Sequence, residues 1–117
     1  MPMRSVRQPS GSPYSGVLTA LVVEDDTKAA NLIKLQLEAK GFHVLHAVSA
    51  EVALEIAVQQ PLSLITLDIL LPNMDGWEFL ERIKKVPELR HIPVVIISIV
   101  TDRAKGLALG AAAIACA

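Results

Sequence analysis

The sequence has few aromatic side chains and only one cysteine. Aromatic residues make up 3% of the 117 residues, so any hydrophobic core has to be built from valine, isoleucine, leucine and alanine. Because Cys116 is the only cysteine, no disulfide can form within the chain. A lack of disulfides is typical of reducing compartments, and we expect a cytoplasmic location.

Strong net charge and long apolar runs are also missing. The net charge is −1, and the only adjacent basic residues are Lys84 and Lys85, which argues against a nucleic-acid-binding surface. No apolar run approaches the roughly 20 residues that cross a membrane. After Arg4 and Arg7 the chain continues with proline, serine and glycine, unlike a signal peptide. We therefore expect neither a nucleic acid nor a membrane as a partner of this segment.

The first 16 residues differ in composition from the rest. They hold three prolines, four serines and two glycines, and bury too little apolar surface to offset the entropy of ordering. We predict a disordered arm or linker over residues 1–16 and one folded domain over residues 17–117.

Short apolar runs alternate with segments of helical periodicity. In the predicted helix over residues 27–40, Ala30, Ile33 and Leu37 lie on one side with Leu32 and Leu35 close by. Apolar strands joined by helical connections indicate an α/β fold, a doubly wound parallel sheet with helices on both faces. Strands are predicted over residues 17–23, 42–48, 62–68, 93–99 and 112–117, and further helices over 50–60, 76–86 and from 101 or 102 to 109.

Carboxylates follow two of the buried strands. The first strand ends in Glu24, Asp25 and Asp26, and the third ends in Asp68. Ser98 lies near the end of the fourth. Ligands of such sheets bind outside the carboxyl ends of the strands, so we expect these residues to converge.

Converging carboxylates repel one another. At roughly 4–6 Å and an effective dielectric constant near 20, each pair costs about 3–4 kcal/mol before screening. A bound proton or a divalent cation relieves this repulsion. Oxygen ligands without histidine or cysteine favour Mg²⁺ or Mn²⁺, and the backbone carbonyl of Leu70 could be a further ligand. With a metal bound, Asp68 could act as a nucleophile toward a phosphoryl group, with Ser98 donating a hydrogen bond to it.

These features together closely resemble the receiver domain of two-component response regulators. The resemblance covers residues 17 to about 116 and includes the three acidic residues after the first strand, the segment LDILLPNMDG around Asp68, and Ser98 after VVII. It implies a five-stranded, flavodoxin-like sheet of order 2-1-3-4-5. It also implies transfer of a phosphoryl group to Asp68 from a histidine kinase or phosphotransfer protein.

The resemblance implies specific roles for the site residues. Asp25 and Asp26 match the acidic pair that binds Mg²⁺, with Asp26 the closer match to the direct ligand. Asp68 matches the phosphoacceptor, and Ser98 matches the hydroxyl switch that follows the phosphoryl group. The chain would be a signalling switch, not an enzyme with an external product, with no catalytic residue beyond Asp68.

The C-terminal end departs from the receiver pattern, which reads G-A-x-x-aromatic-x-x-Lys-Pro. In that register Ile114 takes the place of the aromatic residue and Ala117 that of the lysine. The last helix is absent as well. We expect either a truncated or a degenerate receiver, with an apolar sheet face that a homodimer or an additional domain covers.

Other interpretations remain open. A pseudo-receiver would use the same fold as a protein-interaction module without phosphoryl transfer. A metal-dependent phosphohydrolase also uses an aspartyl nucleophile, but no second aspartate lies two residues after Asp68. One of Asp25 and Asp26 can instead cap the first helix, and for Glu24 a solvated loop position is as consistent with the sequence as a direct role.

Overall fold

A parallel sheet of five strands organises the chain. The computed structural model describes the backbone of residues 18–69, 71, 75–98 and 103–116, and their side chains except at 98, 103–104 and 114–116. All pairings are parallel, in the order β2-β1-β3-β4-β5. This order confirms the predicted fold. The strands are β1 (Leu18–Val23), β2 (Phe42–Ala47), β3 (Leu64–Leu67), β4 (Val94–Ser98) and β5 (Ala113–Cys116).

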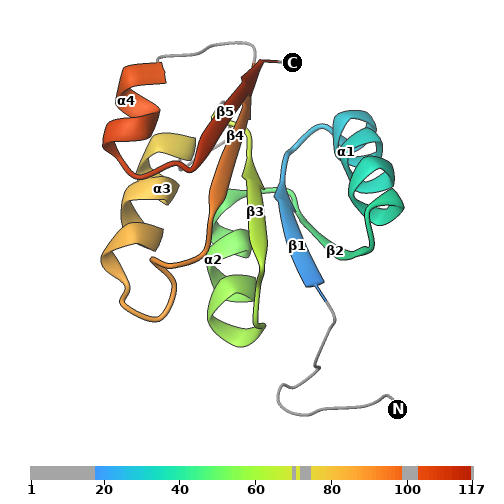
Figure 1. Ribbon diagram of the computed structural model, residues 1–117, viewed down its shortest axis with the longest axis horizontal. Helices are drawn as coiled ribbons and strands as arrows, with labels where there is room; N and C mark the ends of the chain where they lie inside the picture. Colours follow the sequence, from blue (N-terminus) through green and yellow to red (C-terminus); the bar gives the residue numbers. More distant parts are fainter. Residues whose placement is uncertain (1–17, 70, 72–74, 99–102, 117) are drawn as a thin grey trace.

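Helices lie on both faces of this sheet. Helix α1 (Thr27–Ala39) covers one face, and α2 (Ala50–Gln59), α3 (Gly76–Lys85) and α4 (Arg103–Ala108) cover the other (Figure 1). The predicted elements agree with these bounds to within a few residues. The predicted arm over residues 1–16 lies outside the described residues. No helix in the described part of the chain is long and apolar enough to span a membrane.

The main core lies between the sheet and the α2–α4 layer. Its side chains are aliphatic apart from Phe79, as the scarcity of aromatic residues requires. Each large side chain buried there stabilises the fold by about 1.5–3 kcal/mol relative to an exposed one. The largest fully buried members are Leu21, Val23, Ile65, Leu67, Phe79, Leu80, Ile83, Val94 and Ile96.

The sheet face toward α1 is only partly covered. Across the strands the pairing register aligns Val22, Thr66, Val95 and Ala113 in one row. Val22 and Thr66 are buried, Val95 is half-buried and Ala113 is exposed. Along this row the open part of the apolar face lies on the β4–β5 side, while Val22 of β1 and Thr66 of β3 are covered.

Helix α1 buries a narrower stripe than predicted. Ala30 is buried, and Ile33 and Leu37 are half-buried, in agreement with the prediction. Leu32 and Leu35, which were expected close to that side, are 64% and 63% exposed. At about 100° per residue these two positions lie on the opposite side of the helix from Ala30.

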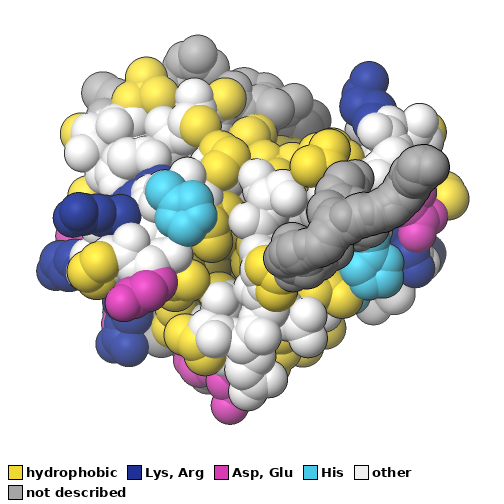
Figure 2. Space-filling view, turned by 60° about the horizontal axis from the view of Figure 1, so that its bottom comes forward, with side chains coloured by type: hydrophobic (Ala, Val, Ile, Leu, Met, Phe, Trp, Pro, Cys, Tyr) yellow, Lys and Arg dark blue, Asp and Glu magenta, His cyan; other side chains and the backbone are white. Residues whose placement is uncertain are grey.

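The two ends of the sheet differ in character. Figure 2 brings forward the amino ends of the strands, where apolar side chains gather over the middle of the surface. A groove of about 350 Å³ lies at this end of the molecule, between the end of α2 and the segment before β4. The acidic residues predicted to form the site follow the opposite, carboxyl ends of the strands.

Candidate functional site

Neighbouring strands bring the acidic residues together. β1 and β3 are paired so that Val23 lies opposite Leu67. Each strand therefore delivers the next residue, Glu24 or Asp68, at the same level of the sheet. Backbone hydrogen bonds continue past the strand ends, because the Asp68 N–H donates to the Val23 carbonyl (3.0 Å) and the Glu24 N–H to the Ala47 carbonyl (3.0 Å).

Three carboxylates form a compact cluster at this edge. Glu24, Asp25 and Asp68 each offer an oxygen atom within 4.8 Å of the others. Glu24 is buried, with 8% of its surface exposed, Asp68 is half-buried and Asp25 is exposed. The carboxyl end of the sheet thus brings Asp25 and Asp68 together, as predicted from their positions after the strands. Glu24 is the third member of the cluster.

Asp26 lies outside this cluster, contrary to the expectation that it is the closer metal ligand. It is the N-cap of α1, and its carboxylate oxygen accepts a hydrogen bond from the Lys28 N–H (2.9 Å). Its side chain is exposed. The acidic pair that faces Asp68 is therefore Glu24 and Asp25, one residue earlier than predicted.

Crowding changes the acidity of Glu24. The pKa of Glu24 is raised from 4.5 to about 7, and burial of the carboxyl group is the main cause. A hydrogen bond from the Asp26 N–H to Glu24 Oε2 (3.1 Å) opposes this increase in pKa. The charge of Asp68 and hydrogen bonds with Asp68 and Asp25 contribute to the increase. At neutral pH the cluster therefore holds a proton for part of the time unless a cation compensates the charge.

The start of α3 lies directly against the backbone of Asp68 and Ile69. Asp75 caps this helix, since its Oδ1 accepts from the Glu78 N–H (2.9 Å). The Gly76 N–H donates to the Ile69 carbonyl (2.9 Å). A Cβ atom at Gly76 would lie 2.6 Å from Ile69 Cα and 2.7 Å from the Asp68 carbonyl oxygen. Only glycine fits there, because the helix start lies directly against the backbone of the aspartate.

Two predicted site residues are described only in part or not at all. Ser98 ends β4, and because Leu67 pairs with Ile96, its backbone lies one residue beyond the level of Asp68 at the same sheet edge. Its side chain is not among the described ones. Leu70, expected to offer its carbonyl, lies outside the described residues.

Sequence reasoning left the role of Glu24 undecided and missed that of His46. Glu24 was open between a loop position and a direct role, although counting residues from the paired strands would have placed it level with Asp68. No role was assigned to His46, but its Nε2 donates to the Glu24 carbonyl oxygen (2.7 Å) from β2. No local pattern marks His46; only the pairing of Val22 with His46 brings it there.

Sequence comparisons identify the family. The response regulator receiver domain family matches residues 20–114. The chain is 36% identical over 94 residues to the response regulator PleD of Caulobacter vibrioides, an alignment that covers 78% of this chain and 21% of PleD. The chain spans between 21% and 44% of the length of the first curated relatives it matches.

Solved structures agree with this assignment. The N-terminal domain of a response regulator receiver protein from Methanoculleus marisnigri is 34% identical, with a TM-score of 0.77, over 84% of this chain and 82% of the other. The Mn²⁺-bound form of response regulator Rcp1 is 26% identical, with a TM-score of 0.77, over 85% and 80%. The chain belongs to the response regulator receiver domains of two-component signalling, a family whose general function is phosphorylation on an aspartate.

Proposed function

We propose that Asp68 is the phosphoacceptor of this receiver, which residues 17–117 form as one domain. The observation that carries the proposal is the carboxylate cluster, in which Glu24 and Asp25 lie within 4.8 Å of Asp68. Asp68 follows a buried strand and is itself half-buried. Its carboxylate is thus held at the strand end and remains within reach of a phosphodonor.

The donor set fits Mg²⁺ or Mn²⁺. All three members offer carboxylate oxygens, which are the ligands that these hard cations prefer, and Rcp1 is a similar receiver with a Mn²⁺-bound form. The raised pKa of Glu24 supports the same conclusion, because crowded carboxylates gain most from a compensating cation. We propose Glu24, Asp25 and Asp68 as the carboxylates that hold it, with the Leu70 carbonyl as a further ligand. When bound, the cation would neutralise the oxygens of the transferring phosphoryl group.

The transfer itself is a substitution at phosphorus. A carboxylate oxygen of Asp68 forms a bond to the phosphorus while the phosphorus–nitrogen bond of a phosphohistidine breaks. The imidazole leaves and takes a proton from solvent. Asp68 becomes an acyl phosphate, and the added charge lies at the end of β3. We propose that the Ser98 hydroxyl at the end of β4 responds to this charge and shifts the segment that leads to α4.

Receiver domains interact with histidine kinases or phosphotransfer proteins, and α1 is a suitable surface for such a donor. The helix begins two residues after Asp25, and on it Leu32 and Leu35 expose large apolar side chains to solvent. Exposed apolar residues on one helix side are typical of protein contacts. We expect Leu32→Ser with Leu35→Ser to lower the rate of transfer from a phosphorylated phosphotransfer protein at least about tenfold. Phosphorylation by acetyl phosphate should stay unchanged; an equal loss with both donors would contradict a docking role.

The partly open β4–β5 side is a second contact surface in this proposal. Val95 and Ile97 are half-buried there, and Ala113 is exposed. A further segment, another domain or a second copy would bury them. Ile97→Lys should then weaken the binding of the segment, domain or second copy that covers this side, as measured by sedimentation. Unchanged binding would contradict a contact surface here.

Incubation with acetyl phosphate and Mg²⁺ tests the phosphoacceptor assignment. We expect a mass increase of one phosphoryl group in the natural chain and none in Asp68→Asn, with Asp26→Asn as the matched control that keeps the increase. Chelation of Mg²⁺ should abolish it. No mass increase in the natural chain would favour the pseudo-receiver, and an increase that survives Asp68→Asn would place the acceptor elsewhere.

A further inference from the structure

The exposed side of α3 carries acidic residues followed by basic ones. Glu78 and Glu81 come first along the helix, and Arg82 and Lys85 follow them. All four side chains are exposed. Lys84 does not belong to this surface, because its Nζ donates to the carbonyls of Arg90 (2.9 Å) and Ile92 (3.0 Å).

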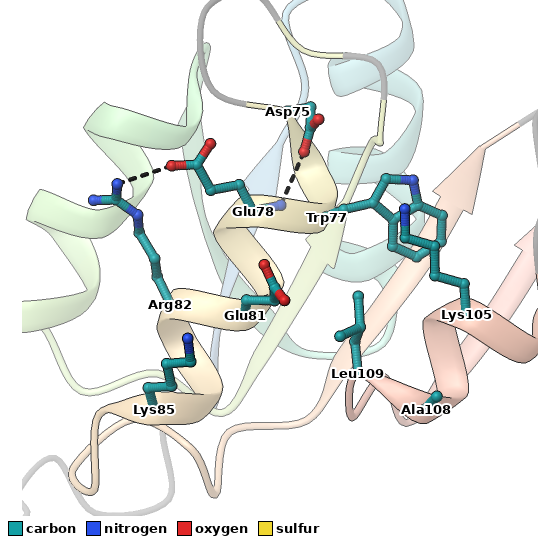
Figure 3. A pocket seen from close by; sticks show the side chains of 9 residues that line it. All are labelled: Asp75, Trp77, Glu78, Glu81, Arg82, Lys85, Lys105, Ala108 and Leu109. Atoms are coloured by element: carbon teal, nitrogen blue, oxygen red, sulfur yellow. Dashed lines mark hydrogen bonds and ion pairs between the residues drawn. The ribbon is translucent and has the colours of Figure 1, made fainter.

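A groove of about 670 Å³ runs along this side, between α3 and α4 (Figure 3). Apolar side chains line it: Trp77 from α3, Ala108 at the end of α4 and Leu109 directly after it. Lys105 lies across the groove from α3, with its Nζ 4.8 Å from the centre of the Trp77 ring. The groove therefore offers apolar contact area with charged side chains along its rim.

The charges along the rim are only partly used within the chain. Glu78 and Arg82 form an exposed ion pair (2.8 Å) one helical turn apart. Glu81 and Lys85 have the same spacing on the same wall, yet neither forms an ion pair with any residue that the structure describes. One acidic and one basic group are thus left to interact with a partner.

We propose that this groove binds a second copy of the chain, with the two α3 helices antiparallel about a twofold axis. A helix surface on which acidic residues precede basic ones is complementary to its own antiparallel copy. Glu81 of each copy then faces Lys85 of the other, so that the contact forms twice. Trp77 and Leu109 supply the apolar contacts beside these pairs. The dimer does not depend on phosphorylation of Asp68.

The charge order of α3 has a simpler explanation that the experiment must separate. Acidic residues near the start and basic residues near the end of a helix also stabilise its macrodipole. That effect acts within one chain and requires no groove. It predicts a monomer whose helix weakens slightly when either charge is reversed.

Sedimentation equilibrium at low salt distinguishes the two explanations. We expect the natural chain to form dimers that dissociate as salt is added. Glu81→Lys and Lys85→Glu should each raise the dissociation constant about tenfold or more, because each reversal creates two like-charge contacts. An equimolar mixture of these two variants should form heterodimers with nearly the natural affinity. Glu55→Lys on the exposed surface of α2 is the control for net charge and should leave the dimer intact.

Trp77 provides a second, local measurement. It is the only tryptophan, and it lines the groove, so its fluorescence should change with protein concentration over the same range as dimer formation. A natural chain that stays monomeric would overturn the proposal. So would a dimer that both charge reversals leave unchanged, a mixture that does not restore it, or a dimer that leaves Trp77 emission unaltered.

Discussion

The carboxyl end of the sheet and the groove between α3 and α4 both gather charged side chains, but in opposite ways. At the sheet end, Glu24, Asp25 and Asp68 bring like charges within 4.8 Å of one another, partly out of water. On α3, acidic and basic side chains share one exposed surface. Crowded like charges destabilise the fold and favour a proton or a cation. Mixed exposed charges cost the fold little and serve selective contact with another molecule.

The largest predicted difference between the two regions concerns their glycines. Gly76→Ala at the sheet end should lower the free energy of unfolding by about 3 kcal/mol, because backbone atoms of Asp68 and Ile69 lie where the methyl group would be. Gly110→Ala after α4 should cost only about 1 kcal/mol, since its φ of +104° is strained for alanine but the nearest atoms belong to the flexible Lys84 side chain. Urea unfolding measures both. Equal losses would show that the two regions are equally constrained.

Glu24→Gln should reduce the pH dependence of the free energy of unfolding, because Glu24 at the carboxyl end of the sheet contributes to it. Between pH 4.5 and about 7 the folded chain keeps Glu24 protonated while the unfolded chain does not, because the folded pKa is raised. The free energy of unfolding should therefore fall as the pH rises through this range, with the full loss present above about 7. The groups that face Glu24 are Asp25, Asp68 and, at its backbone carbonyl, His46.

Urea titrations at several pH values in the presence of a chelator measure this slope. The slope should be shallower in Glu24→Gln, and Mg²⁺ should flatten it in the natural chain. Glu55→Gln on the exposed surface of α2 is the control and should keep the natural slope. An unchanged slope in Glu24→Gln would contradict the raised pKa.

The smallest effect is expected on the α3 surface. Glu78→Gln removes the exposed 2.8 Å ion pair with Arg82, whose side chain is 55% exposed. Such pairs contribute about 0.3–0.5 kcal/mol, and salt screens them. Thermal unfolding of a dilute sample should show a small loss of stability at low salt that disappears at high salt. A loss as large as that of Gly76→Ala would mean that α3 depends on this pair far more than its exposure indicates.

The fold was predictable because its signals are local and repeated. Apolar strands, helical periodicity and stops such as Gly41 and Gly110, both with positive φ, recur along the chain and fix the element order. The strand order itself came from the resemblance to receivers, since no local pattern specifies which strands pair.

The site was predictable only as far as strand ends could locate it. Asp25 and Asp68 were expected together, and the structure brings them together. The local sequence could not show that Glu24, and not Asp26, joins the cluster, because both are acidic residues after the same strand. What separates them is geometry: Glu24 lies level with Asp68 across the paired strands, while Asp26 lies two residues further on and accepts from the Lys28 N–H in the first turn of α1.

The interior position of β1 has a consequence for how the protein is made. β1 leaves the ribosome before the other four strands of this sheet, yet it lies between β2 and β3. Until residues 64–67 emerge, the pair of β1 and β2 has one edge of free backbone N–H and carbonyl groups flanked by buried-type side chains. Such an edge readily pairs with other chains. The apolar segment of β1 that delivers the acidic residues is therefore also the one that most needs protection during synthesis.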